Sequence, residues 1–215
     1  MLAEISASPD GTRAWSLRRA DLEHLREALP KLQDQRVLMV AGEGEAPLPC
    51  AVSLAAAAAA SGRRTALVEC DVARPRLAAL LGLAPAPGVH EYLRWEAQPQ
   101  QMLQPVAMGG PAAAGAAEPL VCIVAGRPAA NPGVLFGLQS FAHMTAKLRA
   151  AYDLLVLSGP PLLSEPEPAR AVAQAADAVV AGVSAAEATG RAARPLRAAV
   201  KRLSSPALGA IAIDA

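Results

Sequence analysis

Residues 36–49 read RVLMVAGEGEAPLP. The apolar run Val37–Ala41 has the length and the lack of polar alternation that are typical of a strand buried on both faces. A loop rich in Gly and Glu follows, and the Ala-rich segment 49–60 is expected to be a helix opened by proline. After a short turn, residues 65–70 predict a second buried strand. Strand, loop, helix and strand in this order indicate a βαβ unit with parallel strands.

The rest of the chain continues this alternation. Buried strands are expected at 120–124, 154–157, 178–183 and 208–213, long helices at about Gly133–Ala151 and Glu187–Leu203, and short helices ending at Leu81 and Trp95. Short apolar strands between helices predict an α/β fold with a doubly wound, mostly parallel sheet in three layers. We assign residues 36–215 to this domain and residues 1–35 to an N-terminal segment that contains a first helix, Leu17–Leu29. The stretch Ala107–Pro119 offers little to bury and is expected to be a surface loop.

Composition narrows the class of protein. Hydrophobic residues make up 53% of the chain and aromatic residues only 3%, which predicts a core of Ala, Leu and Val. The net charge is +1 with scattered basic residues, which argues against nucleic acid as a partner. No stretch has the length and bulk of a membrane helix, and the start lacks the order of a secretory signal. We therefore expect a cytoplasmic protein without direct membrane insertion.

The cysteines and histidines do not have the spacing of metal ligands. The cysteines lie in apolar segments, so we expect them to be buried and unpaired, and the histidines to be surface or packing residues. We predict no metal site at these residues, which are Cys50, Cys70, Cys122, His24, His90 and His143.

A ligand site in such a sheet lies at the carboxyl ends of the strands, where loops 42–49, 70–75 and 158–161 are expected to converge. A phosphate-binding loop there needs free backbone N–H groups, a Lys for the phosphates and a Ser or Thr for Mg²⁺. When the following helix sets the register, Pro47 stands at the Lys position and Leu48 at the hydroxyl position. We therefore expect a P-loop NTPase-like fold. Its loop keeps the glycines of a phosphate-binding loop but lacks the Lys and the hydroxyl residue.

The loop also carries two acidic residues, Glu43 and Glu45. Two like charges about 4 Å apart repel by roughly 4 kcal/mol at an effective dielectric constant of 20, and they would also repel a polyphosphate. The alternative is that both side chains point to solvent. In either case the Lys and the hydroxyl are missing, so we expect no nucleotide cofactor and no bound metal.

Four segments, in order, resemble the cytoplasmic ATPase modules of bacterial exopolysaccharide and capsule export, the tyrosine-kinase-like branch of the Min and Par ATPase group. The segments are 43–49 (EGEAPLP), 66–75 (ALVECDVARP), 125–132 (AGRPAANP) and 152–161 (YDLLVLSGPP). In the family the corresponding loops resemble PGEGKST, LLIDADLRRP, AGxxPxNP and YDYVIIDTPP. The resemblance implies a degenerate nucleotide site at Gly44, Glu45, Pro47, Asp71 and Ser158, where Ser158 replaces the metal-side Asp and Glu69 replaces the first Asp of the second motif.

Two other family features are weak here. The family's kinases carry a tyrosine cluster that receives phosphate, whereas this chain has only Tyr92 and Tyr152. The family's first helix carries Glu-x-x-Arg-x-x-Arg for ring assembly, and the best register here gives Ala20, Glu23 and Arg26. A homo-oligomer is compatible with this register but not required by it.

These observations favour a non-catalytic, pseudo-kinase or pseudo-ATPase component of exopolysaccharide biosynthesis and export. The resemblance implies that it acts by binding a membrane polysaccharide co-polymerase, which would hold it peripherally at the inner membrane. The alternatives are an active tyrosine autokinase that binds ATP and Mg²⁺ with Asp71 almost alone, or a Min- or Par-type positioning ATPase. The latter would want a basic DNA-binding face or an amphipathic membrane helix, and neither is evident.

The expected partner surface combines the first helix with the loop end of the sheet, and its candidate anchors are Arg26 and Arg74. Leu22, Leu25 and Leu29 follow one another at spacings of three and four, and so form one apolar stripe along the first helix. Such a stripe more often packs on the protein's own sheet. Both interpretations of the stripe are open at this point.

Overall fold

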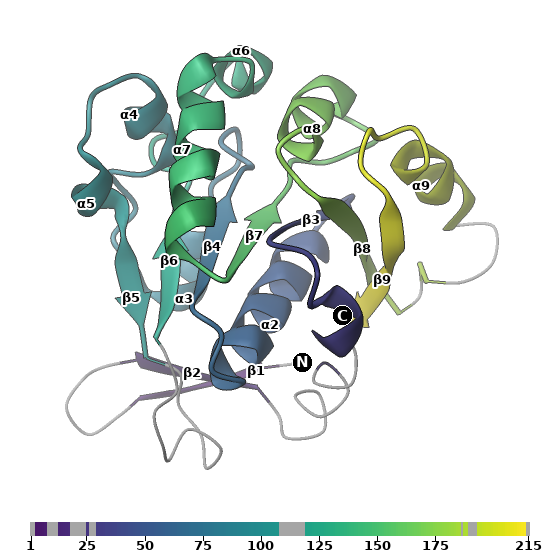
Figure 1. Cartoon of the computed structure of the whole chain (residues 1–215), viewed down its shortest axis with the longest axis horizontal. Coiled ribbons are helices and arrows are strands. Elements are labelled where there is room, and N and C mark those ends of the chain that lie inside the picture. The colour runs from purple at the N-terminus through teal and green to yellow at the C-terminus, as the bar shows by residue number, and fades with distance from the viewer. Residues whose placement is uncertain are drawn as a thin grey trace.

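The computed structural model describes residues 3–7, 13–17, 25, 29–107, 119–185, 187–188 and 193–213. Its main sheet has seven strands in the order β5-β6-β4-β7-β3-β8-β9 (Figure 1). The strands are β3 (Val37–Gly42), β4 (Thr65–Glu69), β5 (Gln104–Val106), β6 (Leu120–Ile123), β7 (Leu154–Ser158), β8 (Ala178–Ser184) and β9 (Ala207–Ile213). Every neighbouring pair is parallel except β5 with β6. The predicted doubly wound, mostly parallel α/β sheet is confirmed.

Helices cover both faces of this sheet. They are η1 (Leu29–Leu32), α2 (Pro47–Ala60), α3 (Leu77–Leu81), α4 (Val89–Leu93), α5 (Pro99–Met102), α6 (Pro132–Phe136), α7 (Gln139–Ala151), α8 (Pro166–Ala173) and α9 (Ala193–Val200). Successive side chains of β3 point to opposite faces, so Met39 packs with α7 and α8 while Leu38 packs with α2. The two resulting cores, one on each face, give the three layers.

The Ala-rich segment forms α2, which starts at Pro47 rather than at Pro49. Twelve of its residues are buried, and its small side chains let the helix lie close to β3, β4, β7 and β8. A helix that is apolar all round is typical of an interior position. None of the helices in the described ranges is long and apolar enough to cross a membrane.

Two predicted helices are wrong in extent. The segment expected as one helix, Gly133–Ala151, forms α6 and α7, because Leu138 takes an extended backbone with ψ of 145° between them. The helix expected from Glu187 begins only at Ala193 as α9. The Glu187 carboxylate instead accepts hydrogen bonds from the backbone N–H and the hydroxyl of Ser184, which ties it into the turn after β8.

The N-terminal segment contains strands that we did not predict. β1 (Ala3–Ala7) and β2 (Arg13–Leu17) pair antiparallel with each other, so Leu17 ends a strand instead of beginning the first helix. Leu25 is helical, and it and Leu29 pack against the same core as α2, which favours the interpretation that the stripe packs internally. Leu22 and Arg26 lie outside the described residues, as does most of the expected loop 107–119.

The three cysteines are free and buried, as predicted. Burial raises the pKa of Cys50 and of Cys122 to about 12, so both are inert thiols at neutral pH. Within the described ranges, no three potential ligands among His, Cys, Asp and Glu gather as a metal site would require.

One buried hydroxyl in α2 costs stability. Ser53 is 2% exposed, and its Oγ has no hydrogen-bond partner among the described residues. We expect Ser53→Ala to raise the free energy of unfolding by about 1 kcal/mol, because an unsatisfied buried hydroxyl is removed and Ala favours helix. Chemical denaturation measures the change.

The matched control is Ser140→Ala, because Ser140 is also buried in a helix but its hydroxyl donates to the Leu93 carbonyl at 3.1 Å. The free energy of unfolding of this variant should fall by about 1 kcal/mol. Equal effects of the two substitutions would show that Ser53 is satisfied in solution.

Candidate nucleotide-binding site

The three predicted loops do converge at the carboxyl ends of the central strands. They surround a small cavity lined by Gly44, Pro47, Leu48, Glu69, Asp71, Arg76, Ser158, Gly159 and Pro161. The space open to the centre of a water molecule is about 10 Å³, so the cavity holds one water at most. The candidate residues Gly44, Pro47, Asp71 and Ser158 are therefore brought together, but around no space in which a phosphate group fits.

Pro47 fills the start of α2. It is the first helical residue after the N-cap Ala46, and Pro47 and Pro49 leave two of the four positions at the helix start without an N–H. The Pro47 ring packs against the ends of β3 and β8. A Cβ added at Gly42 would lie 2.6 Å from Pro47 Cγ, and one added at Gly182 would lie 2.9 Å from Pro47 Cα. Leu48, at the hydroxyl position, is buried in the α2 core.

The two loop glutamates bond to different elements and not to solvent alone: Glu43 is partly buried, whereas Glu45 is exposed, as the solvent-exposed alternative expects. Glu43 accepts hydrogen bonds from the Ser164 hydroxyl at 2.7 Å and from the Leu163 N–H at 2.8 Å. Glu45 forms an ion pair with Arg76. Glu45 is 90% exposed, so this pair contributes little to stability by itself.

Glu69 is a structural carboxylate that the sequence did not reveal. It is 1% exposed at the end of β4, and it accepts hydrogen bonds from the backbone N–H groups of Arg76 (2.6 Å), Leu77 (2.8 Å) and Ala125 (3.0 Å). Burial raises the pKa of Glu69, and these three donors oppose the rise. The side chain thus fastens the start of α3 and the chain after β6 to the end of β4.

Asp71 and Arg74, both matched to the family motif, are engaged with each other. Arg74 Nε lies 3.4 Å from Asp71 Oδ2, and Arg74 Nη2 lies 2.6 Å from Glu165 Oε1. Burial raises the pKa of Asp71, while the Arg74 charge opposes the rise. Arg74 remains half exposed, whereas Asp71 is 7% exposed. Asp71 therefore stabilises its loop through Arg74, and the outer side of the Arg74 side chain stays exposed.

Arg76 is a cation that sequence reasoning missed. It lines the cavity, pairs with Glu45 and donates to the Gly44 carbonyl at 3.4 Å, so it bridges the loop after β3 and the loop after β4. Its position directly after the Arg74-Pro75 motif was the available signal. Ser158 lies opposite at the end of β7, is 3% exposed, and offers no carboxylate for a metal ion.

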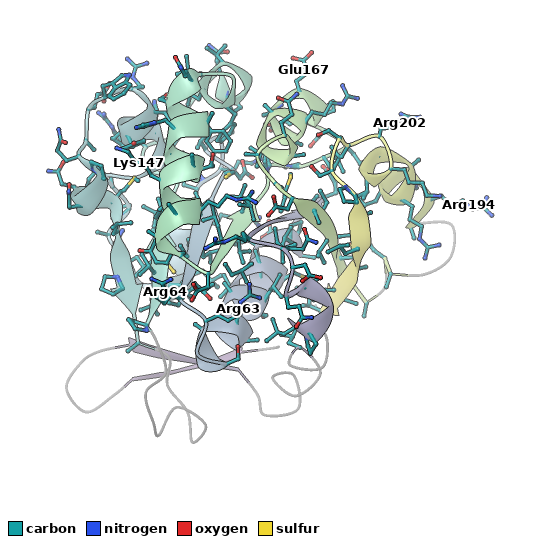
Figure 2. The ribbon with its side chains drawn as sticks, in the orientation of Figure 1. Arg63, Arg64, Lys147, Glu167, Arg194 and Arg202 are labelled. Carbon is teal, nitrogen blue, oxygen red and sulfur yellow. The ribbon has the colours of Figure 1, made fainter. Side chains whose placement is uncertain are left out.

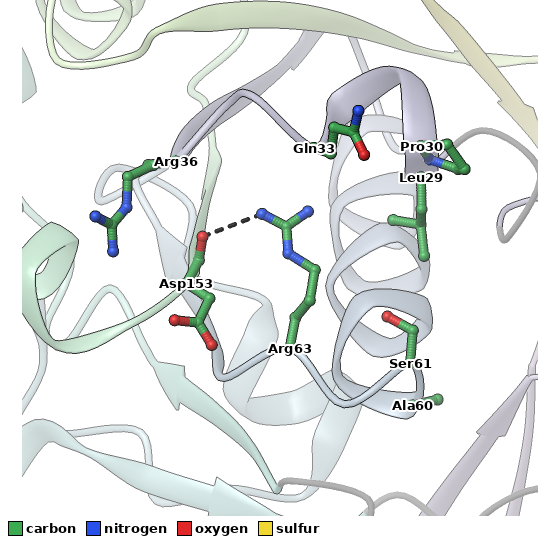
Figure 3. A pocket seen from close by; sticks show the side chains of 8 residues that line it. All are labelled: Leu29, Pro30, Gln33, Arg36, Ala60, Ser61, Arg63 and Asp153. Carbon is green, nitrogen blue, oxygen red and sulfur yellow. Dashed lines mark hydrogen bonds between the residues drawn. The ribbon is translucent and has the colours of Figure 1, made fainter.

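A much larger pocket, about 800 Å³, lies at the opposite end of the sheet. Figure 3 shows Arg63 extending into it toward Asp153. The guanidinium donates to the carbonyls of Asp153 (3.1 Å) and Gln35 (3.3 Å), and burial lowers the pKa of Arg63. These bonds join the turn before β4 to the chain segments before β3 and β7. We therefore assign Arg63 a structural role.

The geometry can be compared with known structures. No protein-family model matches the chain, and no curated protein matches it in sequence. Bacterial tyrosine kinase domains are among its structural neighbours. The VpsO kinase domain is 25% identical with a TM-score of 0.73, covering 91% of this chain and 95% of that one. The kinase domain of the Escherichia coli tyrosine kinase ETK is 16% identical with a TM-score of 0.74, covering 90% and 75%.

An ATPase of the Min group is also similar. The cell division ATPase MinD of Pyrococcus furiosus is 13% identical with a TM-score of 0.63, covering 81% of this chain and 70% of that one. The expected likeness to tyrosine-kinase-like modules and to the P-loop NTPase fold is thus confirmed. Within that fold, this chain has Pro47, Leu48 and Ser158 at the three positions described above.

The role of Glu69 can be measured by stability. Glu69→Ala leaves three buried or partly buried backbone N–H groups without their acceptor, so we expect a loss of about 3 to 5 kcal/mol in the free energy of unfolding. Glu69→Gln keeps the acceptor oxygen for Arg76 and Leu77 but turns an amide N–H toward Ala125, so its loss should be smaller. Chemical denaturation of both variants checks the order.

Glu167→Ala is the control. Glu167 is exposed and points away from α8 in Figure 2, so its removal should change stability by less than about 0.5 kcal/mol. If Glu69→Ala is as mild as this control, the three hydrogen bonds do not hold the loops.

Proposed function

We propose that this protein is a non-catalytic component of exopolysaccharide biosynthesis and export that acts by binding a membrane polysaccharide co-polymerase. The observation that carries the proposal is Pro47, whose ring is packed against Gly42 and Gly182 at the position where the family resemblance requires the phosphate-binding Lys. The export pathway and the partner come from that resemblance. Membrane association would then be peripheral and indirect, through the co-polymerase.

Several physical features support the loss of nucleotide handling. Phosphoryl transfer depends on positioned cations, backbone donors and a metal ion held by carboxylate or hydroxyl oxygens. Here Pro47 and Pro49 remove two donors, Leu48 is apolar, and Ser158 replaces a metal-side carboxylate. The cavity between the loops holds one water at most.

An active ATP-dependent tyrosine autokinase is the second candidate, favoured by Asp71 and by Arg76 beside it. Arg76 would have to leave Glu45 and take over the role of the missing Lys, which the weak, exposed ion pair permits. The two tyrosines that could accept the phosphate are poorly placed for it. Tyr92 is 6% exposed in α4, and Tyr152 is half-buried at the end of α7, so neither is a flexible substrate.

The absence of nucleotide binding is directly measurable. We expect isothermal titration of the protein with Mg-ATP to give no binding in the micromolar range, because several charge-assisted contacts of about 1.5 to 3 kcal/mol each are missing. A micromolar dissociation constant would contradict the proposal. Glu45→Ala, which frees Arg76, tests the autokinase directly, since this variant should bind no better than the parent.

Asp71 should be dispensable for function. We expect Asp71→Ala to support polysaccharide export in cells like the parent, because Asp71 braces a loop and handles no phosphate. Asp71→Asn keeps the acceptor for the Arg74 N–H and separates bracing from charge. If both variants fold and accumulate normally yet abolish export and anti-phosphotyrosine signal, the protein is a kinase.

Partner binding is expected at the loop end of the sheet. Truncating Arg74 should reduce the free energy of binding to a co-polymerase encoded nearby by about 1 to 3 kcal/mol, as is typical of an interface anchor. Co-purification with this partner should weaken accordingly. Arg26→Ala tests the second anchor, which lies outside the described residues. Arg149→Ala is the control, because Arg149 is also half exposed and paired, with Asp177 at the other end of the sheet. Equal binding by all three variants would place the interface elsewhere.

A further inference from the structure

β9 leaves one edge of the main sheet open. Among the described strands it pairs only with β8, and its seven residues, ALGAIAI, include no charge and no proline. The opposite edge is different, because β5 has only three residues and contains Pro105. Proteins commonly protect an exposed edge with a short strand, a proline or a charge. β5 has two of these features, whereas β9 has none of them.

The backbone direction shows which groups of β9 face this open edge. The Ile213 carbonyl accepts a hydrogen bond from the Ala185 N–H at 2.7 Å, so Ile213 directs its backbone groups toward β8. Successive residues of a strand direct theirs to opposite sides, so Ala210 and Ala212 each direct an N–H and a C=O outward. Both residues are exposed. They supply the donors and acceptors that a further strand would need.

The side chains of β9 leave room for such a strand. Ile211 and Ile213 pack in the core that contains α2. Ala210 and Ala212 therefore point to the other face of the sheet, which α7, α8 and α9 cover. A neighbouring strand lies about 4.8 Å away, and the methyl groups of these two alanines do not obstruct it.

Positive charge accompanies the open edge. α9 leads directly into β9 through the turn 201–206, and Figure 1 shows this helix at the outer end of the sheet. The helix and the turn carry four exposed cations, which are Arg194, Arg197, Lys201 and Arg202. Figure 2 shows Arg194 and Arg202 extending away from the ribbon. None of the four forms an ion pair with a carboxylate of the described ranges.

The acidic residue before α9 does not neutralise this charge. Arg197 Nη2 donates to the Ala188 carbonyl at 3.4 Å, whereas the neighbouring Glu187 carboxylate accepts from the Ser184 hydroxyl at 2.8 Å. The cations at positions 194, 197 and 201 follow one another at spacings of three and four, which places them along one side of α9 and the turn after it. A row of cations without carboxylate partners attracts an anionic ligand.

We propose that β9 is a docking edge for an extended acidic segment of a partner protein, which adds to the main sheet as a further strand. The backbone of the segment would pair with the outward N–H and C=O groups of Ala210 and Ala212. Its alternate side chains would point to the face that α9 covers, and acidic residues at these positions would meet the α9 cations.

Other occupants fit this surface less well. If two copies of the chain paired through antiparallel β9 strands, both α9 helices would lie on the same face of the joined sheet and bring their cations together. A lipid or nucleic-acid surface would neutralise the cations but leave the outward backbone groups of β9 unpaired. An acidic extended segment matches both features. The edge is separate from the Arg74 surface, and this inference does not rest on the proposed function.

A displayed library of random dodecapeptides, selected on the full chain, tests the proposal. We expect enrichment of peptides that carry Asp or Glu at alternate positions, because alternate side chains of an added strand face α9. One enriched peptide is then synthesised and titrated by fluorescence anisotropy. Arg194→Glu should bind it about tenfold more weakly, because a carboxylate replaces an attracting cation. Lys147→Glu, the same change of charge on α7, should leave the affinity unchanged.

Ala210→Pro tests the backbone pairing. It removes an outward N–H that the ladder to β8 does not use, so the variant should keep the circular dichroism of the parent and bind the peptide about tenfold more weakly. A second measurement uses the parent chain and so does not depend on the folding of this variant. Hydrogen exchange followed by NMR should be slower at the Ala210 and Ala212 amides when the peptide is bound.

Three results would overturn the proposal: selected peptides without alternating acidic residues, unchanged exchange at both alanine amides in the bound parent, or equal binding by the parent and Arg194→Glu. Sedimentation that shows a dimer dissolved by Ala210→Pro would assign the edge to a second copy of the chain and would also overturn it.

Discussion

The close approach of α2 to the sheet is the constraint on which the rest of the structure depends. Six consecutive alanines, residues 55–60, and two strand glycines, Gly42 and Gly182, allow the helix to start against the ends of β3 and β8. The loop between Gly42 and Pro47 must then cross directly over the carboxyl ends of the strands. In a nucleotide-binding protein of this fold that crossing forms an anion cradle. Here the Pro47 ring and the buried Leu48 occupy the same place.

The polar residues around that loop bond to one another and to the loop backbone. Glu69 holds three backbone N–H groups, Asp71 braces Arg74, Arg76 pairs with Glu45, and Glu43 holds the turn at Ser164. A phosphate-binding site needs its donors and cations unpaired and preorganised for the ligand. In this chain these polar groups fasten loops to one another instead.

The strands and their parallel order were predictable because each strand is a continuous apolar run, and α2 was predictable from its prolines and alanines. The predictions that were wrong or missing depended on local turns or on pairing with distant residues. Leu138 breaks a helix through its backbone conformation, Glu187 binds back to Ser184, and the edge strand β5 has only three residues. At the site, Pro47 and Leu48 were readable from register. The bracing role of Glu69 was not, because Ala125, one of its partners, lies 56 residues away.

The central claim is that the loops over the sheet are closed to nucleotide in solution. Hydrogen–deuterium exchange of the full chain, with and without millimolar Mg-ATP, tests it at residues 42–50 and 69–77. We expect the amide exchange of both segments to be identical in the two samples, because no phosphate reaches their N–H groups. Slower exchange at both segments with Mg-ATP, absent with Mg²⁺ alone, would show that the site opens to nucleotide and would contradict the claim.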